Sequence, residues 1–125
     1  MLMPNVKSMR KITYLLLLFM CFSFTQTEDS YQMTVTKISE AYNAKDADAL
    51  YGLFSSDLQS SFTLDKTKGF IMKNLSENGT MGESTFLTND NDNRHYLVEF
   101  KNSSVILVLG LSSDNKITHL SLEEY

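Results

Sequence analysis

The sequence predicts an α+β fold in which N-terminal helices pack on one face of an antiparallel four-stranded sheet. Apolar residues recur every three or four positions in the first part of the chain and every second position after Gly79, which are the periods of helices and of strands. Short connections join the strand-forming segments. Sequential strands are therefore expected to be antiparallel neighbours, because parallel pairing requires a long crossover connection.

The start of the chain has the charge order of a secretory signal peptide. Lys7, Arg10 and Lys11 precede an uncharged apolar run over 12–24, and polar residues follow it. The run is about 13 residues long, whereas a helix needs roughly 20 residues to cross a bilayer. We therefore expect an export signal and no permanent membrane anchor.

Small residues predict the cleavage site. Ser23 and Thr25 stand three and one positions before Gln26, which is an acceptable small-x-small pattern. Cleavage there makes residues 1–25 a signal peptide and residues 26–125 a single domain of ordinary size. The mature protein is then exported to the periplasm or the extracellular space.

Cys21 leaves an alternative open, because lipoproteins are cleaved just before a cysteine that then carries the lipid anchor. Against lipidation, the bulky Met20 stands where a small residue is expected. Cys21 is the only cysteine, so cleavage before Gln26 leaves a mature chain without thiols. Disulfides, thiolate metal sites and cysteine nucleophiles are then excluded.

The predicted mature chain is acidic. It keeps all 15 acidic residues and loses three of the 11 basic ones, which gives a net charge of −7. Such a surface repels phosphate backbones and anionic lipid, and no basic cluster offsets the repulsion. Nucleic acid and, after signal cleavage, membranes are therefore not expected as partners.

Two helical patterns follow the leader. In the first, apolar residues four, three and four positions apart share one helix face: Tyr31, Val35, Ile38 and Tyr42. The second pattern is shorter and consists of Ala47, Leu50, Tyr51 and Phe54. Asp46 is expected to cap the second helix, and Asp48 lies in its first turn, where the helix dipole favours negative charge.

A third helix and four strands complete the predicted fold. The helix is expected from about Leu64 to Ser76, with Thr63 or Asp65 as its cap and Gly79 ending it. The turn-rich strings "DNDN" and "SSDN" then separate period-2 segments. These segments are "ESTFLTN", "RHYLVEF", "SSVILVLGL" and "KITHLSLEEY".

Three strings give the chain a family resemblance: "YNAKDADALYGLFSSDLQ", "TLDKTKGFIMKNL" and "NKITHLSLEEY". Together with the order of helices and strands, they resemble the nuclear transport factor 2-like superfamily, which includes ketosteroid isomerases. Within it they are most similar to an uncharacterised bacterial domain of secreted proteins. That domain often precedes a serine hydrolase of the β-lactamase or penicillin-binding type.

The resemblance implies a cone in which a curved sheet wraps against the helices and leaves an apolar cavity at its open end. Tyr42 and Phe54 would approach this cavity from the helices. Tyr96 and Phe100 share one strand face, whose opposite face carries charged groups, so the Tyr96 face is expected to point inward. His119 is a further candidate on the sheet. The alternative is that this aromatic cluster is only core.

The residues expected inside the cavity do not predict catalysis. An isomerase of the ketosteroid type needs a general-base carboxylate and an oxyanion donor in an apolar site. No acid lies on the face expected to point inward, and Asp46, Asp48 and Asp57 fall at helix ends. His95 and His119 are too widely spaced to predict a metal site in a thiol-free chain. We therefore expect no catalytic residues, no metal and no cofactor.

The segment "SVILVLGL" is apolar on both of its faces, whereas a strand with one face in water should alternate. Ile106 and Val108 make its outer face apolar, and Leu97 on the preceding strand extends this strip. Such a strip marks a contact surface. We expect a homodimer or a separate serine-hydrolase-type partner there.

Two functional hypotheses remain open. The leading one is an exported, non-catalytic binding or accessory domain with an apolar pocket for a small ligand and a sheet face for a partner. The alternative is a small ketosteroid-isomerase-like or hydrolase-like enzyme that uses the same pocket. A buried carboxylate within about 3 Å of a pocket donor would favour the enzyme.

Overall fold

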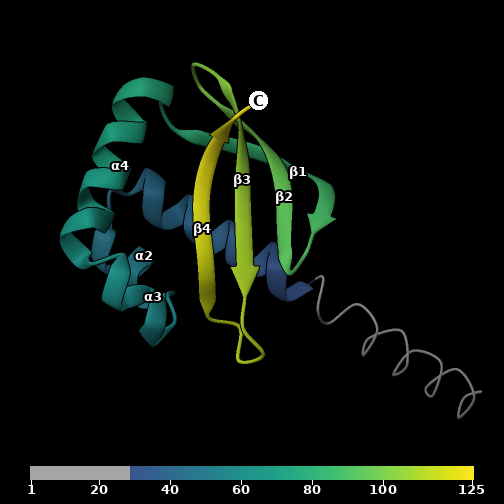
Figure 1. The fold of residues 1–125 in the computed structure, drawn as a ribbon. Coiled ribbons are helices and arrows are strands. Elements are labelled where there is room, and N and C mark those ends of the chain that lie inside the picture. The colour runs from purple at the N-terminus through teal and green to yellow at the C-terminus, as the bar shows by residue number, and fades with distance from the viewer. Residues whose placement is uncertain (1–28) are drawn as a thin grey trace, which may run out of the picture. The chain divides into compact units, whose positions relative to one another are not determined.

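The computed structural model describes residues 29–125 (Figure 1). The chain divides into two compact units, Met1–Gln32 and Met33–Tyr125, and the second carries the fold described below. Of the first unit only residues 29–32 are described, and they are helical. The predicted signal peptide, its cleavage site and Cys21 therefore lie outside the described residues.

Within residues 29–125, four helical segments precede the sheet. The N-terminal helix is described over 29–43. It is followed by α2 (Ala47–Gly52), α3 (Ser56–Ser61) and α4 (Leu64–Asn78). The three predicted helices are thus present, and α3 is an additional one that the sequence pattern did not predict.

Each short helix begins at a side-chain cap. Asp46 accepts a hydrogen bond from the Ala49 backbone N–H at 3.0 Å, which confirms it as the N-cap of α2. Ser55 caps α3 through the Leu58 N–H at 3.2 Å. α3 has no buried residue, so its formation depends on this cap and not on an apolar stripe. That is the physical reason why periodicity missed it.

Helix α4 has the start and the end that the sequence predicts. Thr63 is its N-cap, and Gly79 follows its last residue with a φ of 83°. A Cβ on Gly79 would lie 2.9 Å from the Cβ of Lys101. Glycine is therefore required here both by the backbone conformation and by the close approach of the neighbouring loop.

The sheet is an antiparallel meander of four strands in the order β1-β2-β3-β4. The strands are β1 (Met81–Asp90), β2 (Asn93–Phe100), β3 (Ser104–Leu111) and β4 (Ile117–Glu124). All four predicted strands are confirmed, with ends that differ from the predicted ones by up to two residues. The α+β class and the antiparallel connectivity are thereby confirmed.

The core lies between the sheet and the helices. Tyr96 pairs with Leu107, and Leu107 pairs with Leu122, so these residues share the face that points toward the helices. Tyr96 is 3% exposed and Leu107 1%, which shows that the face carrying Tyr96 is the buried one, as predicted. From the helices, Tyr42 meets the ring of Phe100 edge-on, with 5.6 Å between centroids.

The loop between α4 and β1 is bonded to the end of the N-terminal helix. The Tyr42 hydroxyl donates to the Gly79 carbonyl at 2.8 Å. The Asn43 side chain accepts from the Met81 N–H at 2.8 Å and donates to the Met81 carbonyl at 3.0 Å. The Asn43 amide thus occupies the place that a neighbouring strand would take at the start of β1.

The role of Asp46 gives a stability prediction. Asp46→Ala should lower the free energy of unfolding by about 0.5–2 kcal/mol, the range for losing an N-cap. Asp46→Asn should restore most of that loss, because its amide oxygen can accept the same bond. Urea unfolding of the three proteins measures the difference. An Asn variant as unstable as the Ala variant would contradict the capping role.

Candidate functional site

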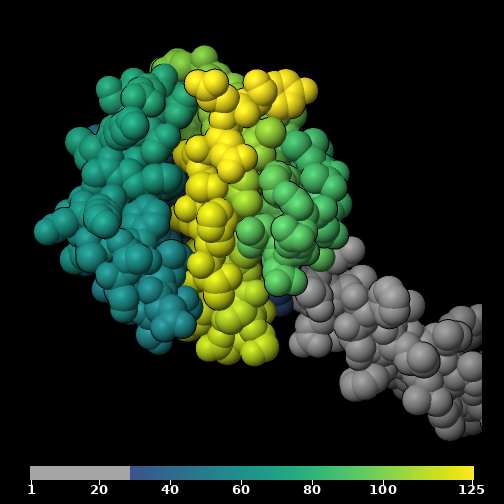
Figure 2. Space-filling model, in the orientation of Figure 1, coloured from purple at the N-terminus to yellow at the C-terminus, as the bar shows by residue number. Residues whose placement is uncertain are grey.

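A groove of about 960 Å³ runs between helix α4 and strand β4. This volume is at the upper end of the range typical of small-ligand pockets. Figure 1 shows α4 beside β4, and Figure 2 shows the surface of the two elements from the same side, with α4 in teal and β4 in yellow. The end of α3 and the start of β3 close its two ends.

The groove lies between β4 and a helix that packs mainly against another helix. α4 packs against α2, and it is the shorter α3 that packs against β4. Thr67 and Ile71 are buried on the inner side of α4. A neighbouring face of the same helix borders the groove through residues three or four positions apart: Lys66, Phe70, Lys73 and Glu77.

Aromatic side chains form an apolar wall at the α3 end of the groove. The rings of Phe54 and Phe62 lie 5.1 Å apart, and those of Phe62 and Phe70 lie 5.6 Å apart. Phe54 is buried in the core, whereas Phe62 and Phe70 are half-buried and line the groove. The row therefore connects the core to a surface on which an apolar ligand can lie.

Strand β4 borders the groove with its edge. Every residue from His119 to Tyr125 contributes to the lining, although neighbouring side chains of a strand point to opposite faces. Lining by consecutive residues is expected only where the groove follows the edge of the strand. In the described part of the chain β3 is the only strand neighbour of β4, which makes β4 an edge strand of the sheet.

Charges are distributed unevenly along the groove. Lys66 and Lys73 lie on its helix wall, and Lys66 donates to the Ser61 carbonyl at 3.1 Å. Glu77 lies in the last turn of α4, while Glu123 and Glu124 are at the end of β4. All of these carboxylates are on exposed residues. They can attract a cation from solution.

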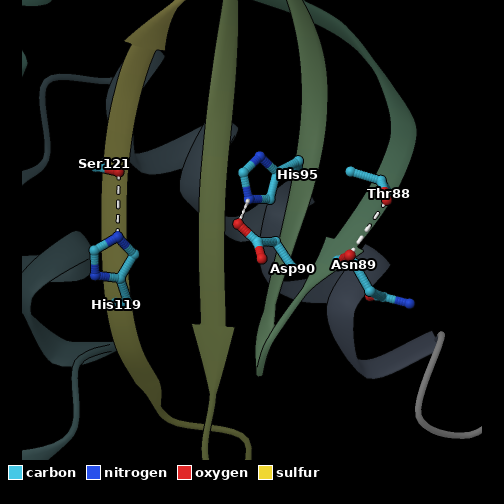
Figure 3. A network of polar contacts seen from close by, with 6 residues as sticks. All are labelled: Thr88, Asn89, Asp90, His95, His119 and Ser121. Atoms are coloured by element: carbon cyan, nitrogen blue, oxygen red, sulfur yellow. Dashed lines mark hydrogen bonds and ion pairs between the residues drawn. The ribbon is translucent and has the colours of Figure 1, made fainter.

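Two polar side-chain pairs lie on the sheet (Figure 3). His119 Nε2 and Ser121 Oγ are 3.2 Å apart on β4, and both residues line the groove. His95 Nε2 and Asp90 Oδ2 are 3.9 Å apart near the turn between β1 and β2. The first pair has the reach of a hydroxyl nucleophile and its base, but among residues 29–125 no carboxylate is bonded to His119.

The predicted pocket residues fall into two groups. Tyr42, Phe54, Tyr96 and Phe100 are buried, and Tyr42 and Phe100 are in ring contact. His119 is exposed and lines the groove.

The groove residues of α4, especially Phe70 and Lys73, were not predicted as site residues. Their spacing places them on one helix face, but it does not show whether that face lies in the core or borders a groove.

The predicted contact residues Leu97 and Ile106 are neighbours on the outer face of the sheet, and both are half-buried. Val108 is 4% exposed without any partner chain, between His95 and Ser121 in the register. Within Met33–Tyr125 no helix covers this face (Figure 1). What a partner could cover there is mainly Leu97 and Ile106.

Over residues 29–125, no three histidine, cysteine, aspartate or glutamate side chains gather as metal ligands would. No helix in the same range is long and apolar enough to span a membrane.

No family model matches the chain, and searches of curated proteins and of solved structures gave no significant match.

Tyr42 gives a pH prediction. Burial raises the pKa of Tyr42 to about 12 from its model-compound value of 10.0, so the phenol remains a hydrogen-bond donor to Gly79 in the folded chain. Between these two pKa values the unfolded phenol ionises while the folded one does not. Its contribution to stability is therefore fully present below pH 10 and is lost as the pH rises toward 12.

Tyr42→Phe should lower the free energy of unfolding by about 1–3 kcal/mol at neutral pH, because the Gly79 carbonyl loses its donor. The difference from wild type should shrink above pH 10, where only the wild type loses this contribution. Urea unfolding at several pH values measures it. Tyr125→Phe is the control, since Tyr125 is 79% exposed. A pH-independent difference would contradict the assignment.

Proposed function

We propose that this chain is an exported, non-catalytic binding or accessory domain that holds its ligand in the groove between α4 and β4. The observation that carries the proposal is the groove itself, with half-buried Phe62 and Phe70 on one wall and the edge of β4 on the other. Support for export, to the periplasm or beyond the cell, comes from the charge order of the leader.

We further propose that the fold is a cone of the nuclear transport factor 2-like type. The sequence resemblance supports this, and so does the arrangement of helices against one face of a four-stranded antiparallel sheet. In such a domain the ligand is expected to be small and apolar or to be a segment of a partner protein. The outer-face residues Leu97 and Ile106 are proposed as a second contact, with another copy or with a serine-hydrolase-type partner.

Catalysis of the ketosteroid-isomerase type has no support in the groove. A general base of that kind needs a carboxylate that is desolvated and aimed at a donor. Glu77, Glu123 and Glu124 are exposed to solvent instead. The tyrosine hydroxyl at Tyr42 is committed to the Gly79 carbonyl.

The hydrolase-like alternative is favoured by one observation, the 3.2 Å contact between His119 and Ser121 in the groove. The purified chain can be tested against an activated ester such as p-nitrophenyl acetate. Hydrolysis that is lost in Ser121→Ala and also in His119→Ala would establish that alternative. If the ester is hydrolysed no faster with the protein than in buffer alone, the hydrolase-like alternative fails and the binding function stands.

Binding in the groove gives a direct prediction. A neutral apolar fluorophore, N-phenyl-1-naphthylamine, should become fluorescent on binding to the full chain, because the rings of Phe62 and Phe70 exclude water. Phe70→Asp should weaken this binding by about tenfold or more, since it places a charge on the apolar wall.

Phe86→Asp is the matched control, because Phe86 is 48% exposed on the opposite edge strand, β1. It should leave fluorophore binding unchanged. Circular dichroism of both variants checks that they fold. The proposed function fails if the folded wild type binds no fluorophore, or if the two variants weaken binding equally.

A further inference from the structure

We propose that the ligand of the groove is an extended peptide segment of another protein, which pairs with the edge of β4 as a fifth strand. This assignment rests on the proposed function, in which the groove is the binding site. Strand addition of this kind joins backbone to backbone and lets alternate side chains of the peptide fill pockets. Four features of the described chain point to it.

The first feature is a row of backbone groups directed into the groove. The Phe100 N–H donates to the Ser103 carbonyl, so Phe100 and Ser103 are a hydrogen-bonded pair at the hairpin between β2 and β3. Hydrogen-bonded and non-bonded pairs alternate along an antiparallel ladder. The β3 residues that bond β2 are therefore Val105, Leu107 and Leu109.

The same alternation fixes the groups on β4. Ile106 and Val108 of β3 are left to bond β4, and they pair with Glu123 and Ser121. The residues between these on β4 direct their N–H and carbonyl groups to the free side of the strand, and they are Leu120, Leu122 and Glu124. Within residues 29–125 no other segment takes these bonds.

The second feature is that the chain already adds a strand residue to this edge. Ile117 donates its N–H to the Leu53 carbonyl at 2.9 Å and accepts from the Ser55 N–H at 2.8 Å. This makes Phe54 a one-residue parallel bridge to Ile117. The chain then turns into α3, and the rest of the β4 edge is left to the groove.

The third feature is the difference between the two edges of the sheet. β1, at the other edge, has two register shifts, between Met81 and Ser84 and between Phe86 and Thr88. Such irregularities prevent the addition of a further strand. β4 pairs with β3 without a shift from His119 to Glu124, so its edge is regular along the groove.

The fourth feature is the helix wall, which decides what kind of partner fits. α4 stands along the β4 edge across the groove, so the edge of a second folded sheet would meet the helix (Figure 2). A single extended strand needs a spacing of only about 4.8 Å from β4. A peptide segment therefore fits where a second copy of this sheet does not.

Charges along the groove specify the peptide further. α4 and β4 run in the same direction. The start of α4 lies near the start of β4, because Phe62, just before α4, contacts Phe54, which bridges to Ile117. The end of α4 lies near the end of β4, because Asn78 bonds Ser103, whose neighbour on β3 pairs close to Glu124. Lysines thus lie toward the start of β4 and carboxylates toward its end. The helix dipole of α4 has the same polarity.

The peptide should therefore carry an acidic residue opposite Lys73 and a basic residue at the end near Glu124. On the other side of the acidic residue, toward the start of β4, an apolar side chain of the peptide should contact the ring of Phe70. Among the described residues no carboxylate pairs with Lys73, so this ammonium is available to a peptide.

Selection from a random-peptide phage library on the full chain tests the proposal, with the best synthetic peptide measured by calorimetry. Leu122→Pro removes one outward N–H and no bond to β3, and edge strands tolerate proline at such positions. It should lower peptide affinity by about tenfold or more, while Leu122→Ala should lower it less. Lys73→Glu should remove the preference for an acidic residue at the matching position.

Amide hydrogen exchange measured by NMR tests for the protection pattern that only strand addition predicts. In the free chain Leu120, Leu122 and Glu124 should exchange fast and Ser121 and Glu123 slowly, and the bound peptide should slow the first three by about tenfold or more. Two N-methylated peptides should differ. Methylation of the backbone nitrogens that face β4 should abolish binding, whereas methylation of the alternate nitrogens, which face away from β4, should leave binding intact. The experiment with methylated peptides uses the unchanged protein, so it tests the proposal even if Leu122→Pro does not fold.

The proposal is overturned if no peptide is selected, if selected peptides protect other amides, or if nitrogen methylation has no effect. Protection of Leu120, Leu122 and Glu124 already in the free chain would also overturn it, because the chain itself would then occupy the edge. If peptides fail while the apolar fluorophore still binds in a Phe70-dependent manner, only this inference falls. If both ligands fail, the proposed function falls as well.

Discussion

The fold depends on the junction at the end of α4, where three segments distant in sequence are held by a few hydrogen bonds. Tyr42 and Asn43 bond Gly79 and Met81 from the N-terminal helix. From the other side, the hairpin between β2 and β3 bonds Asn78 through the Ser103 hydroxyl and the Asn102 N–H. These contacts fix where the helical part of the chain ends and where the sheet begins.

This junction also determines that the groove exists. Asn78 is bonded to the hairpin at one end of α4, and the edge-on contact between the rings of Phe62 and Phe70 holds the first half of the helix near α3. Because α4 is anchored at both ends and packs on α2, it stands beside β4 and not across the sheet. The face of α4 that carries Phe70 and Lys73 therefore lies across the groove from the strand edge.

The sequence predicted the parts of the fold that local chemistry determines. Helices begin after Asp46 and Thr63 and end before Gly79 as expected, because caps and left-handed residues act within a few positions of the chain. The four strands followed from period-2 patterning. α3 was missed because a six-residue helix without buried residues has no periodicity to detect, only the cap at Ser55.

The groove could not be predicted in the same way, because it depends on the distance between α4 and β4. His119 was selected from its alternation on the last strand, and it does line the groove. Phe70 was not predicted as a site residue, since periodicity does not distinguish a side chain in the core from one at the rim of a groove. That distinction depends on how α4 packs on α2, and local sequence patterns do not reveal this packing.

The edge of β4 combines two requirements that usually conflict. A regular, unpaired strand edge invites uncontrolled pairing with other chains, and β1 avoids this with two register shifts. β4 keeps its regular ladder from His119 to Glu124, and the neighbouring α4 limits access to it. A helix that blocks other sheets but leaves room for one strand protects the edge without removing its hydrogen-bonding groups. In the proposed binding mode, the same helix that keeps other sheets away from the edge makes the groove selective for an extended ligand.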